Sequence, residues 1–291
     1  MTFRRKLAAV VICAVTAMWP AHSMAQQTAQ PATQPPAQPP APTRDPDQNL
    51  DGLQPDFTIS ALPTTMRLPR YKSAFRVTHR FGRPLGSGDF GSLASDFFGL
   101  DSGAQIGLEY RFGVMRGLQA GIYRTNDRTI EFFTQYNLMQ QSESRPLGIG
   151  FIAAIDGTDN FSDSFSPALG VAVSRKVGRY AAVYAQPIWV NNANRLPSEL
   201  VDENDSFILG LGIRFRLNRT VYLVGEGAPR VAGYDPGVAH MTFGLEKLVG
   251  GHVFQVNFSN SVGTTLSQVA RGGTTNDDWY LGFNISRKFW R

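Results

Sequence analysis

The sequence predicts an all-β protein: a closed antiparallel transmembrane β-barrel of about twelve strands, with long extracellular loops and short periplasmic turns. Three observations predict it. No apolar run after the first 25 residues is long enough for a membrane-spanning helix. Segments of about 8 to 12 residues alternate apolar and polar side chains. Their connections alternate between long polar loops and tight turns. Because lipid offers no hydrogen bonds, such strands must pair all round and close the sheet.

Residues 1–25 have the pattern of a cleaved signal peptide. Arg4, Arg5 and Lys6 precede an apolar stretch that ends at Trp19, and Ala25 supplies the small residue before cleavage. This stretch of ~13 residues is too short to span a bilayer, which indicates secretion across the inner membrane. The expected location is the outer membrane of a Gram-negative cell. Cys13 is the single cysteine, so the mature protein is expected to hold no disulfide and no thiolate metal site.

Three further segments follow the signal. Residues 26–48 are rich in Pro and Gln and are expected to form a disordered linker. Residues 49–70 carry isolated apolar side chains without a sustained period, which predicts a segment at the periplasmic mouth or a plug in the lumen. Residues 71–291 form the barrel. The formal net charge of +5 falls to +2 without the three basic residues of the signal, so a nucleic-acid partner is not expected.

The strand prediction is clearest between Ser206 and Leu217. Its apolar face holds Phe207, Leu209, Leu211, Ile213 and Phe215, and its other face holds Ile208, Gly210, Gly212, Arg214 and Arg216. The same alternation appears at 73–82, at 103–112 and near the C-terminus at 279–289. Weaker segments lie near 118–125, 128–139, 147–156, 168–177, 181–191, 220–227, 238–248 and 252–262. An even number of strands returns both chain ends to the periplasm.

The connections support the same architecture. Long polar loops are expected at about 83–102, 157–167, 192–205, 228–237 and 263–277, and tight turns at 113–117, 178–180, 218–219 and 250–251. The short connection at 126–128 falls on the long-loop side and is interpreted as a hairpin. Aromatic residues near strand ends are expected to form the interfacial girdles; they are Trp189, Tyr222, Trp279 and Trp290.

Alternation also predicts which polar side chains face the lumen. They are Arg76, Arg80, Glu109, Arg111, Glu131, Arg214, Arg216, Glu246 and Lys288. One interpretation is a network of paired charges that fills a rigid barrel, because unpaired charge in the interior is costly. The other is a narrow polar pore in which the excess of Arg favours small anions. Strand number does not decide between them, because twelve lies between the filled and the water-filled sizes.

Motifs near the first strands carry a family resemblance. His79-Arg80-Phe81-Gly82, then Phe97-Phe98-Gly99-Leu100-Asp101, then Ile106 to Tyr110 and Gly117 to Arg124 resemble the domain-of-unknown-function family 5777. The resemblance covers about residues 67–291 and implies an outer-membrane β-barrel without an assigned activity or substrate. Phe283 to Trp290 also resembles the aromatic last strand that the barrel assembly machinery reads, although Arg291 follows it.

Other chemistry is not expected. Gly86 to Gly91 fits a dinucleotide-binding pattern, but no helix or βαβ unit is predicted after it, so it is interpreted as a glycine-rich loop. The acidic residues Asp156, Asp159 and Asp163, with 202–205, fit no calcium loop and are interpreted as solvated. A hydrolase would have to use His79, His240 or His252, and no supporting motif accompanies them. We therefore predict no enzyme, no catalytic residue, no cofactor and no metal.

The leading functional hypothesis is a narrow channel or binding barrel for small polar solutes. One alternative is a non-conducting structural or interaction barrel that docks a periplasmic partner through its proline-rich linker. The second alternative is an outer-membrane hydrolase. The partners expected from the location are outer-membrane lipid, lipopolysaccharide and the barrel assembly machinery.

Overall fold

The computed structural model describes residues 45–49, 51–194 and 204–290. The predicted signal peptide and most of the predicted linker lie outside them. The strands are β1 Ser73–Phe81, β2 Ala104–Met115, β3 Leu118–Thr125, β4 Ile130–Met139, β5 Gly148–Gly157, β6 Asp163–Val177, β7 Ala181–Val190, β8 Ser206–Arg216, β9 Val221–Ala228, β10 Arg230–Gly233, β11 His240–Val249, β12 His252–Ser259 and β13 Tyr280–Lys288. The short helices are η1 Pro46–Gln48, α1 Phe90–Ser95, η2 Phe97–Gly99, α2 Thr158–Phe161 and α3 Leu266–Arg271.

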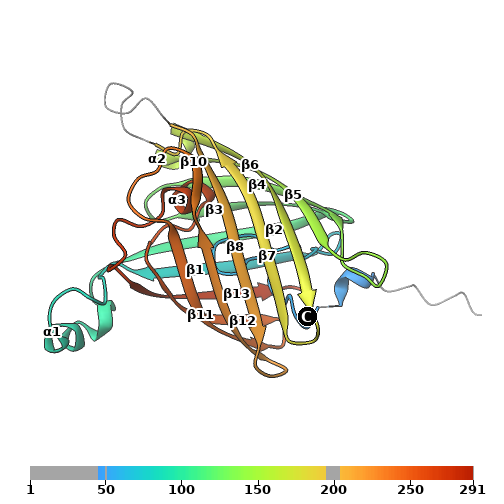
Figure 1. Ribbon diagram of the computed structural model, residues 1–291, viewed down its shortest axis with the longest axis horizontal. Coiled ribbons are helices and arrows are strands. Elements are labelled where there is room, and N and C mark those ends of the chain that lie inside the picture. Colours follow the sequence, from blue (N-terminus) through green and yellow to red (C-terminus); the bar gives the residue numbers. More distant parts are fainter. Residues whose placement is uncertain (1–44, 50, 195–203, 291) are drawn as a thin grey trace, which may run out of the picture. The chain divides into compact units, whose positions relative to one another are not determined.

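Twelve of these strands close into one antiparallel barrel (Figure 1). Consecutive strands pair from β1 to β9, and β9 then pairs with β11, β11 with β12 and β12 with β13. The closing pair is β1 with β13, in register from Ala74 opposite Lys288 to Arg80 opposite Gly282. The extra strand, β10, follows β9 after Pro229 and pairs only with β8. No strand edge of the twelve is left open to lipid.

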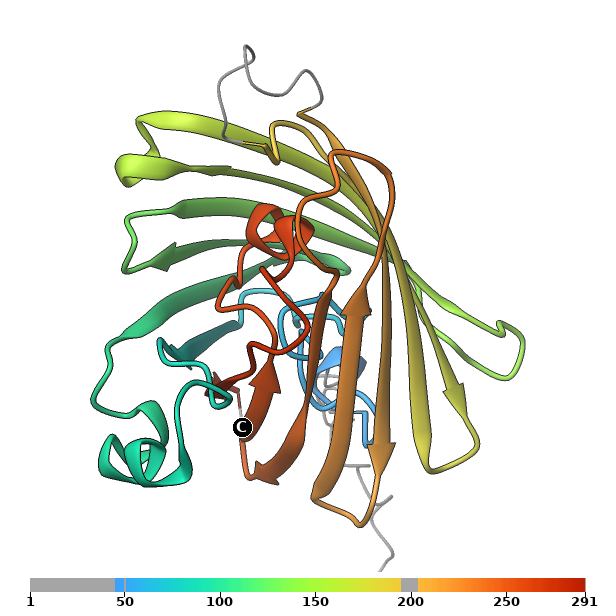
Figure 2. The ribbon, with the colours of Figure 1, turned by 60° about the vertical axis from the view of Figure 1, so that its left-hand side comes forward.

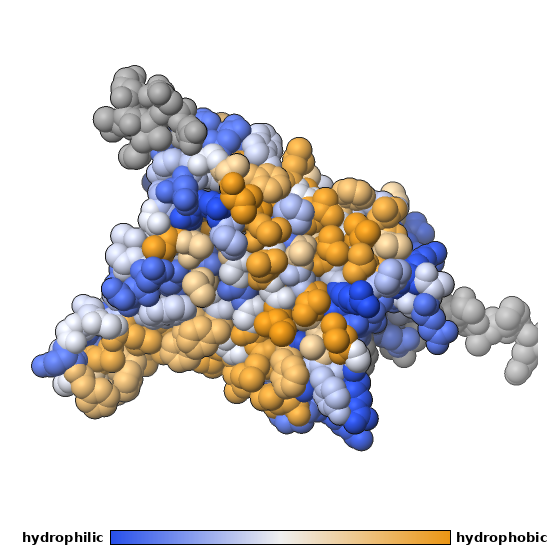
Figure 3. All heavy atoms as spheres, in the orientation of Figure 1, coloured by the Kyte–Doolittle hydropathy of each residue, from blue (hydrophilic) through white to orange (hydrophobic). Residues whose placement is uncertain are grey.

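The outer face of the barrel is apolar because alternate residues of each strand point outward. On β8 the outward Phe207, Leu211, Ile213 and Phe215 are 37 to 47% exposed, whereas Ile208 and Arg214 between them are fully buried. Figure 3 shows apolar side chains across the strands and hydrophilic side chains gathered toward the ends. Among the described residues, no helix is long and apolar enough to cross a membrane.

The two ends of the barrel differ. The loop end carries the connections 82–103, 126–129, 158–162, 191–205, 229–239 and 260–279, and the turn end carries the connections 116–117, 140–147, 178–180, 217–220 and 250–251. β1 begins and β13 ends at the turn end. This alternation and the twelve-stranded closure confirm the fold that the sequence predicts.

Some boundaries and loops differ from prediction. β6 begins at Asp163, inside the predicted loop 157–167, because its first residues extend beyond the barrel wall. The loop 82–103 holds α1, which begins inside the glycine-rich segment 86–91, where no helix was expected. α1 has six residues, and β2 after it is antiparallel to β1, so no βαβ unit forms. The predicted polar loop 263–277 contains α3, most of which is buried.

Two segments occupy the interior of the barrel. We call residues 51–70 the plug, because every residue from Leu53 to Met66 is buried although none lies in a strand of the barrel. We call residues 264–271 the cap; they include α3 and come from the connection between β12 and β13. Figure 2 shows the plug in blue and the cap in red between the walls. Residues 53–66 therefore lie in the lumen.

An introduced charge on the lipid-facing side of the barrel should cost more stability at the middle of a strand than at its end. Leu211→Arg, at the middle of β8, should destabilise the barrel by about 2 to 4 kcal/mol, because the guanidinium would lie in hydrocarbon. Val249→Arg, at the last residue of β11, should cost about 0 to 1 kcal/mol. Denaturant unfolding in lipid vesicles, followed by tryptophan fluorescence, measures both. Equal costs at the two positions would contradict a membrane-spanning outer face.

Candidate functional site: the filled lumen

The centre of the plug is a tight hairpin, which we call the plug hairpin and define as residues 57–64. The Ile59 amide donates to the Leu62 carbonyl at 2.8 Å, and the Thr64 amide donates to the Phe57 carbonyl at 2.8 Å. These bonds leave the backbone groups at the tip, Ser60 and Ala61, without partners inside the hairpin. Because the tip is buried, the barrel wall has to supply those partners.

Glu226 on β9 satisfies the amides of the tip. Its carboxylate accepts hydrogen bonds from the backbone N–H groups of Ser60 at 2.9 Å, Ala61 at 2.8 Å and Leu62 at 3.1 Å. Both carboxylate oxygens are used, and the side chain is fully buried. Hydrogen bonds to an ionised acceptor are roughly twice as strong as neutral ones. Glu226 is therefore the wall residue that holds the hairpin tip most directly.

Three arginines of β1 and β8 donate to carbonyl and hydroxyl oxygens of the plug hairpin. Arg76 on β1 donates to the Ser60 carbonyl at 2.9 Å and to Thr58 Oγ1 at 2.5 Å. Arg80 lies four residues further along β1, on the same face of the strand, and donates to Ser60 Oγ at 3.0 Å. Arg214 on β8 donates to the Thr58 carbonyl at 2.9 Å. The tip is thus held between a carboxylate and three guanidinium groups.

Amide side chains from other strands bind the remaining carbonyls of the plug. The contacts are Gln255 to Ile59 at 2.7 Å, Asn284 to Ser60 at 3.1 Å, Gln186 to Pro63 at 3.0 Å, Gln135 to Thr64 at 2.6 Å, and Asn137 to Met66 at 3.1 Å. These donors come from β12, β13, β7 and β4. Because these strands lie on different sides of the barrel, the plug is bound to the wall on several sides.

The cap fills part of the lumen near the loop end. Glu131 on β4 accepts from the Leu266 amide at 2.8 Å, and Asp156 on β5 accepts from the Thr265 hydroxyl at 2.8 Å and from the Ser267 hydroxyl. A capping box formed by Thr265 and Gln268 begins α3, which fixes the local turn. The two carboxylates therefore act on the cap as Glu226 acts on the plug.

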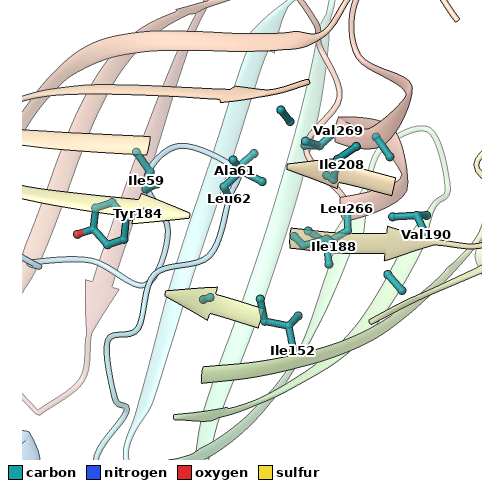
Figure 4. Packing of buried hydrophobic residues seen from close by; sticks show 14 of the residues in the cluster. Ile59, Ala61, Leu62, Ile152, Tyr184, Ile188, Val190, Ile208, Leu266 and Val269 are labelled. Carbon is teal, nitrogen blue, oxygen red and sulfur yellow. The ribbon is translucent and has the colours of Figure 1, made fainter. Parts of the chain in front are cut away.

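Plug and cap share one apolar core with half of the wall. Ile59, Ala61 and Leu62 pack with Leu266 and Val269 of the cap, and with wall residues of β5 to β9 that include Ile152, Tyr184, Ile188 and Ile208 (Figure 4). Gly210 and Gly212 on β8 make room for it. A β-carbon at Gly210 would lie 3.0 Å from the Leu62 side chain, and one at Gly212 would collide with Ile59. Apolar side chains therefore fill this part of the lumen.

The structure places eight of the nine predicted lumen residues in the buried interior; they are Arg76, Arg80, Glu109, Arg111, Glu131, Arg214, Glu246 and Lys288. Arg216 instead lies half-exposed at the turn-end mouth and donates to the Asn218 carbonyl at 3.2 Å. Ion pairs join Arg76 and Arg111 to Glu109, each at 2.9 Å, and Arg214 to Glu246 at 2.6 Å. Lys288 faces Asp56 of the plug at 3.3 Å.

Sequence reasoning missed two wall carboxylates. Glu226 shares parity with the buried Tyr222 and Val224 on β9, a signal that was present but weak in a short strand. Asp156 was interpreted as a solvated loop residue, yet it is 1% exposed because β5 continues through it. With them the described wall buries five basic and five acidic strand residues, leaving histidine aside. The excess of Arg that suggested anion preference is therefore absent from the described wall.

Two further side chains lie in the lumen although sequence analysis did not place them there. Tyr222 belongs to the lumen and not to an interfacial girdle: it is fully buried, and its hydroxyl donates to the Gly52 carbonyl of the plug at 2.9 Å. His240, which sequence analysis named only as a hydrolase candidate, is buried on β11. Its Nε2 lies 3.2 Å from Glu226 Oε1 and 3.1 Å from Thr242 Oγ1.

This geometry does not match a hydrolase triad. In a triad, the acid holds one imidazole nitrogen and the nucleophile contacts the other, whereas both contacts of His240 go to Nε2. His79 faces outward and stacks on Phe283, with ring centroids 4.8 Å apart. His252 contacts Arg287 at 3.2 Å. In the part of the chain that the structure describes, no group of three His, Cys, Asp or Glu side chains could hold a metal ion.

A small cavity remains between plug, cap and wall. Its volume is about 40 Å³, and its lining includes Arg76, Arg111, Glu131, Tyr123 and Thr264. This volume is enough for a few water molecules, each of which needs ~10 to 15 Å³. The cavity is therefore no passage for a solute in this state.

The contacts of Glu226 predict its effect on the plug. Glu226→Gln removes the charge and leaves one oxygen for three amides, which should weaken the hold on the tip by about 1.5 to 3 kcal/mol. Amide exchange at residues 60–62, measured by hydrogen–deuterium exchange mass spectrometry, should accelerate by about 10- to 100-fold. Glu143→Gln, in an exposed turn, serves as the control and should leave exchange unchanged. Unchanged protection in Glu226→Gln would show that this carboxylate does not hold the plug.

Solved structures with similar backbones include the NanC porin (7% identity, covering 74% of this chain and 97% of that one, TM-score 0.49). They also include the Acinetobacter baumannii outer membrane protein Omp33 (7%, 75% and 98%, 0.41) and the Escherichia coli outer membrane phospholipase A (11%, 75% and 90%, 0.39). These values are too low to transfer a function. No curated protein matches the sequence.

The family model described as "Membrane bound beta barrel domain (DUF5777)" matches residues 56–289. The match begins inside the plug and ends at the last residues of the closing strand, so it covers both the wall and the plug hairpin. The chain therefore belongs to this family of membrane-bound β-barrels.

Proposed function

We propose that this protein is an outer-membrane barrel that its own plug keeps closed, and that small polar solutes enter or pass only when the plug hairpin is displaced. The observation that carries the proposal is the binding of the hairpin tip by Glu226, Arg76, Arg80 and Arg214 across the middle of the lumen. The leader-like residues 1–25 and the apolar outer face support the outer-membrane location.

The polar side chains on one part of the wall support a plug that can be displaced from the lumen. The polar side chains of β1, β4, β12 and β13 that bind the plug are Arg, Gln, Asn, Ser and Lys. Arg, Gln and Asn side chains donate to its backbone carbonyls, and Ser286 and Lys288 donate to the Asp56 carboxylate. Water can replace such hydrogen bonds at modest net cost, because each is worth ~0.5 to 1.5 kcal/mol relative to solvent, or ~1.5 to 3 kcal/mol where a guanidinium or ammonium group donates. A vacated lumen would therefore retain a wettable strip along these strands.

A second candidate is a permanently closed interaction or structural barrel, and the apolar half of the lumen favours it. Ile188 and Ile208 on the wall are fully buried against Leu62 of the plug and Leu266 of the cap. Displacing the plug would expose these side chains to water, at ~25 cal/mol per Å² of apolar surface. The two candidates differ in what a barrel without its plug hairpin does.

Conductance in planar bilayers distinguishes them. The full-length protein should show no steady conductance, because the hairpin fills the lumen. Deleting residues 51–66 should produce stepwise channel openings with weak selectivity between K⁺ and Cl⁻, because the described wall balances five basic against five acidic strand residues. Deleting residues 26–44, which leaves the plug in place, is the matched control and should remain silent.

The possible outcomes have different consequences for the two candidate functions. Openings in the full-length protein would overturn the closed state. A silent barrel after the deletion of 51–66, with correct folding shown by heat-dependent gel mobility, would overturn solute passage and leave the interaction barrel. Strong anion selectivity in the deletion variant would contradict the charge balance of the wall.

A further inference from the structure

Basic side chains on the lipid-facing surface lie mainly at one end of the barrel. Among outward-facing strand positions of the described chain, the turn end carries Arg175 on β6, Lys247 on β11 and Arg287 on β13. The loop end carries Arg124 on β3 and Asp163 at the start of β6, which have opposite charges. The lipid-facing surface is therefore basic at the turn end and close to neutral at the loop end.

Three neighbouring strands bring part of this basic surface together. Val249 of β11 is in register with His252 of β12, which is in register with Arg287 of β13, and Arg287 Nη1 lies 3.2 Å from His252 Nδ1. Lys247 is exposed two residues before Val249, and its Nζ donates to Thr220 Oγ1 at 3.0 Å. Lys247, His252 and Arg287 form what we call the basic rim patch.

Apolar side chains continue from the patch toward the middle of the membrane. Leu245, Phe254 and Ile285 are the next outward residues on the same three strands, and Phe254 stacks on His252 with ring centroids 5.7 Å apart. Glu246, between Leu245 and Lys247, points into the lumen, where it forms an ion pair with Arg214. No acidic side chain of these described strands faces outward beside the patch.

We propose that the basic rim patch binds the phosphate of an anionic phospholipid in the leaflet at the turn end, with an acyl chain of the lipid along Leu245, Phe254 and Ile285. Lys247 and Arg287 supply the positive charge, and the adjacent apolar strand faces supply the contact that a free phosphate could not use. This site is on the outside of the barrel, so it stands independently of the plug and of solute passage.

Lipid binding to the full-length protein in a non-ionic detergent tests the site by native mass spectrometry. The wild type should retain phosphatidylglycerol in preference to zwitterionic phosphatidylcholine. Lys247→Gln with Arg287→Gln should weaken phosphatidylglycerol binding by about 25-fold, because each cation near a membrane surface contributes about fivefold. Arg124→Gln with Arg128→Gln removes the same charge at the loop end and is the matched control, which should bind as the wild type does.

Further measurements keep the outcome decisive. Heat-dependent gel mobility establishes that each variant is folded, and raising the salt concentration should weaken lipid binding to the wild type. Equal retention of the two lipids, or wild-type binding in the folded double variant, would overturn the site. Displacement of the lipid by an equal concentration of inorganic phosphate would also overturn it, because it would show an anion site without a lipid contribution.

Discussion

Closure of the sheet by β1 and β13 is the constraint on which the rest of the structure depends. In hydrocarbon each unpaired backbone group costs several kcal/mol, so the first and last strands must pair along their length. The pairing fixes the parity of both strands, and parity in turn places Arg76, Arg80 and Lys288 inside. The inward side chains of this twelve-stranded barrel leave part of the lumen unfilled. The plug and the cap occupy that part.

The contents of the lumen follow from the need to satisfy buried polar groups. A hairpin tip in the middle of a barrel carries backbone donors and acceptors that water no longer reaches, and each would be costly without a partner. Glu226 accepts from the amides, while Arg76, Arg214 and Asn284 donate to the carbonyls. Ion pairs such as Arg214 with Glu246 then compensate the charges that this arrangement buries. The polar side chains of the wall therefore bind the protein's own plug.

Alternation made the barrel and most inward charges predictable, because a strand residue has only two faces. Arg214 and Lys288 lie inside because their neighbours Ile213 and Phe289 face lipid and successive strand residues alternate between the two faces. The plug was predictable only as one of two positions, since its isolated apolar residues match no period. The burial of its hairpin, the burial of the cap and the role of Glu226 depend on contacts between residues more than 100 positions apart, which local patterns do not encode.

Accessibility of the hairpin tip tests the central claim most directly. The chain has no cysteine after Cys13, so single cysteines can be introduced without interference. Ser60 is 1% exposed at the tip, whereas Ser144 is exposed in a turn-end connection. A membrane-impermeant maleimide added to the folded protein should label Ser144→Cys rapidly and leave Ser60→Cys unlabelled until the protein is denatured. Equal labelling of the two cysteines in the folded protein would contradict a barrel closed by its own plug.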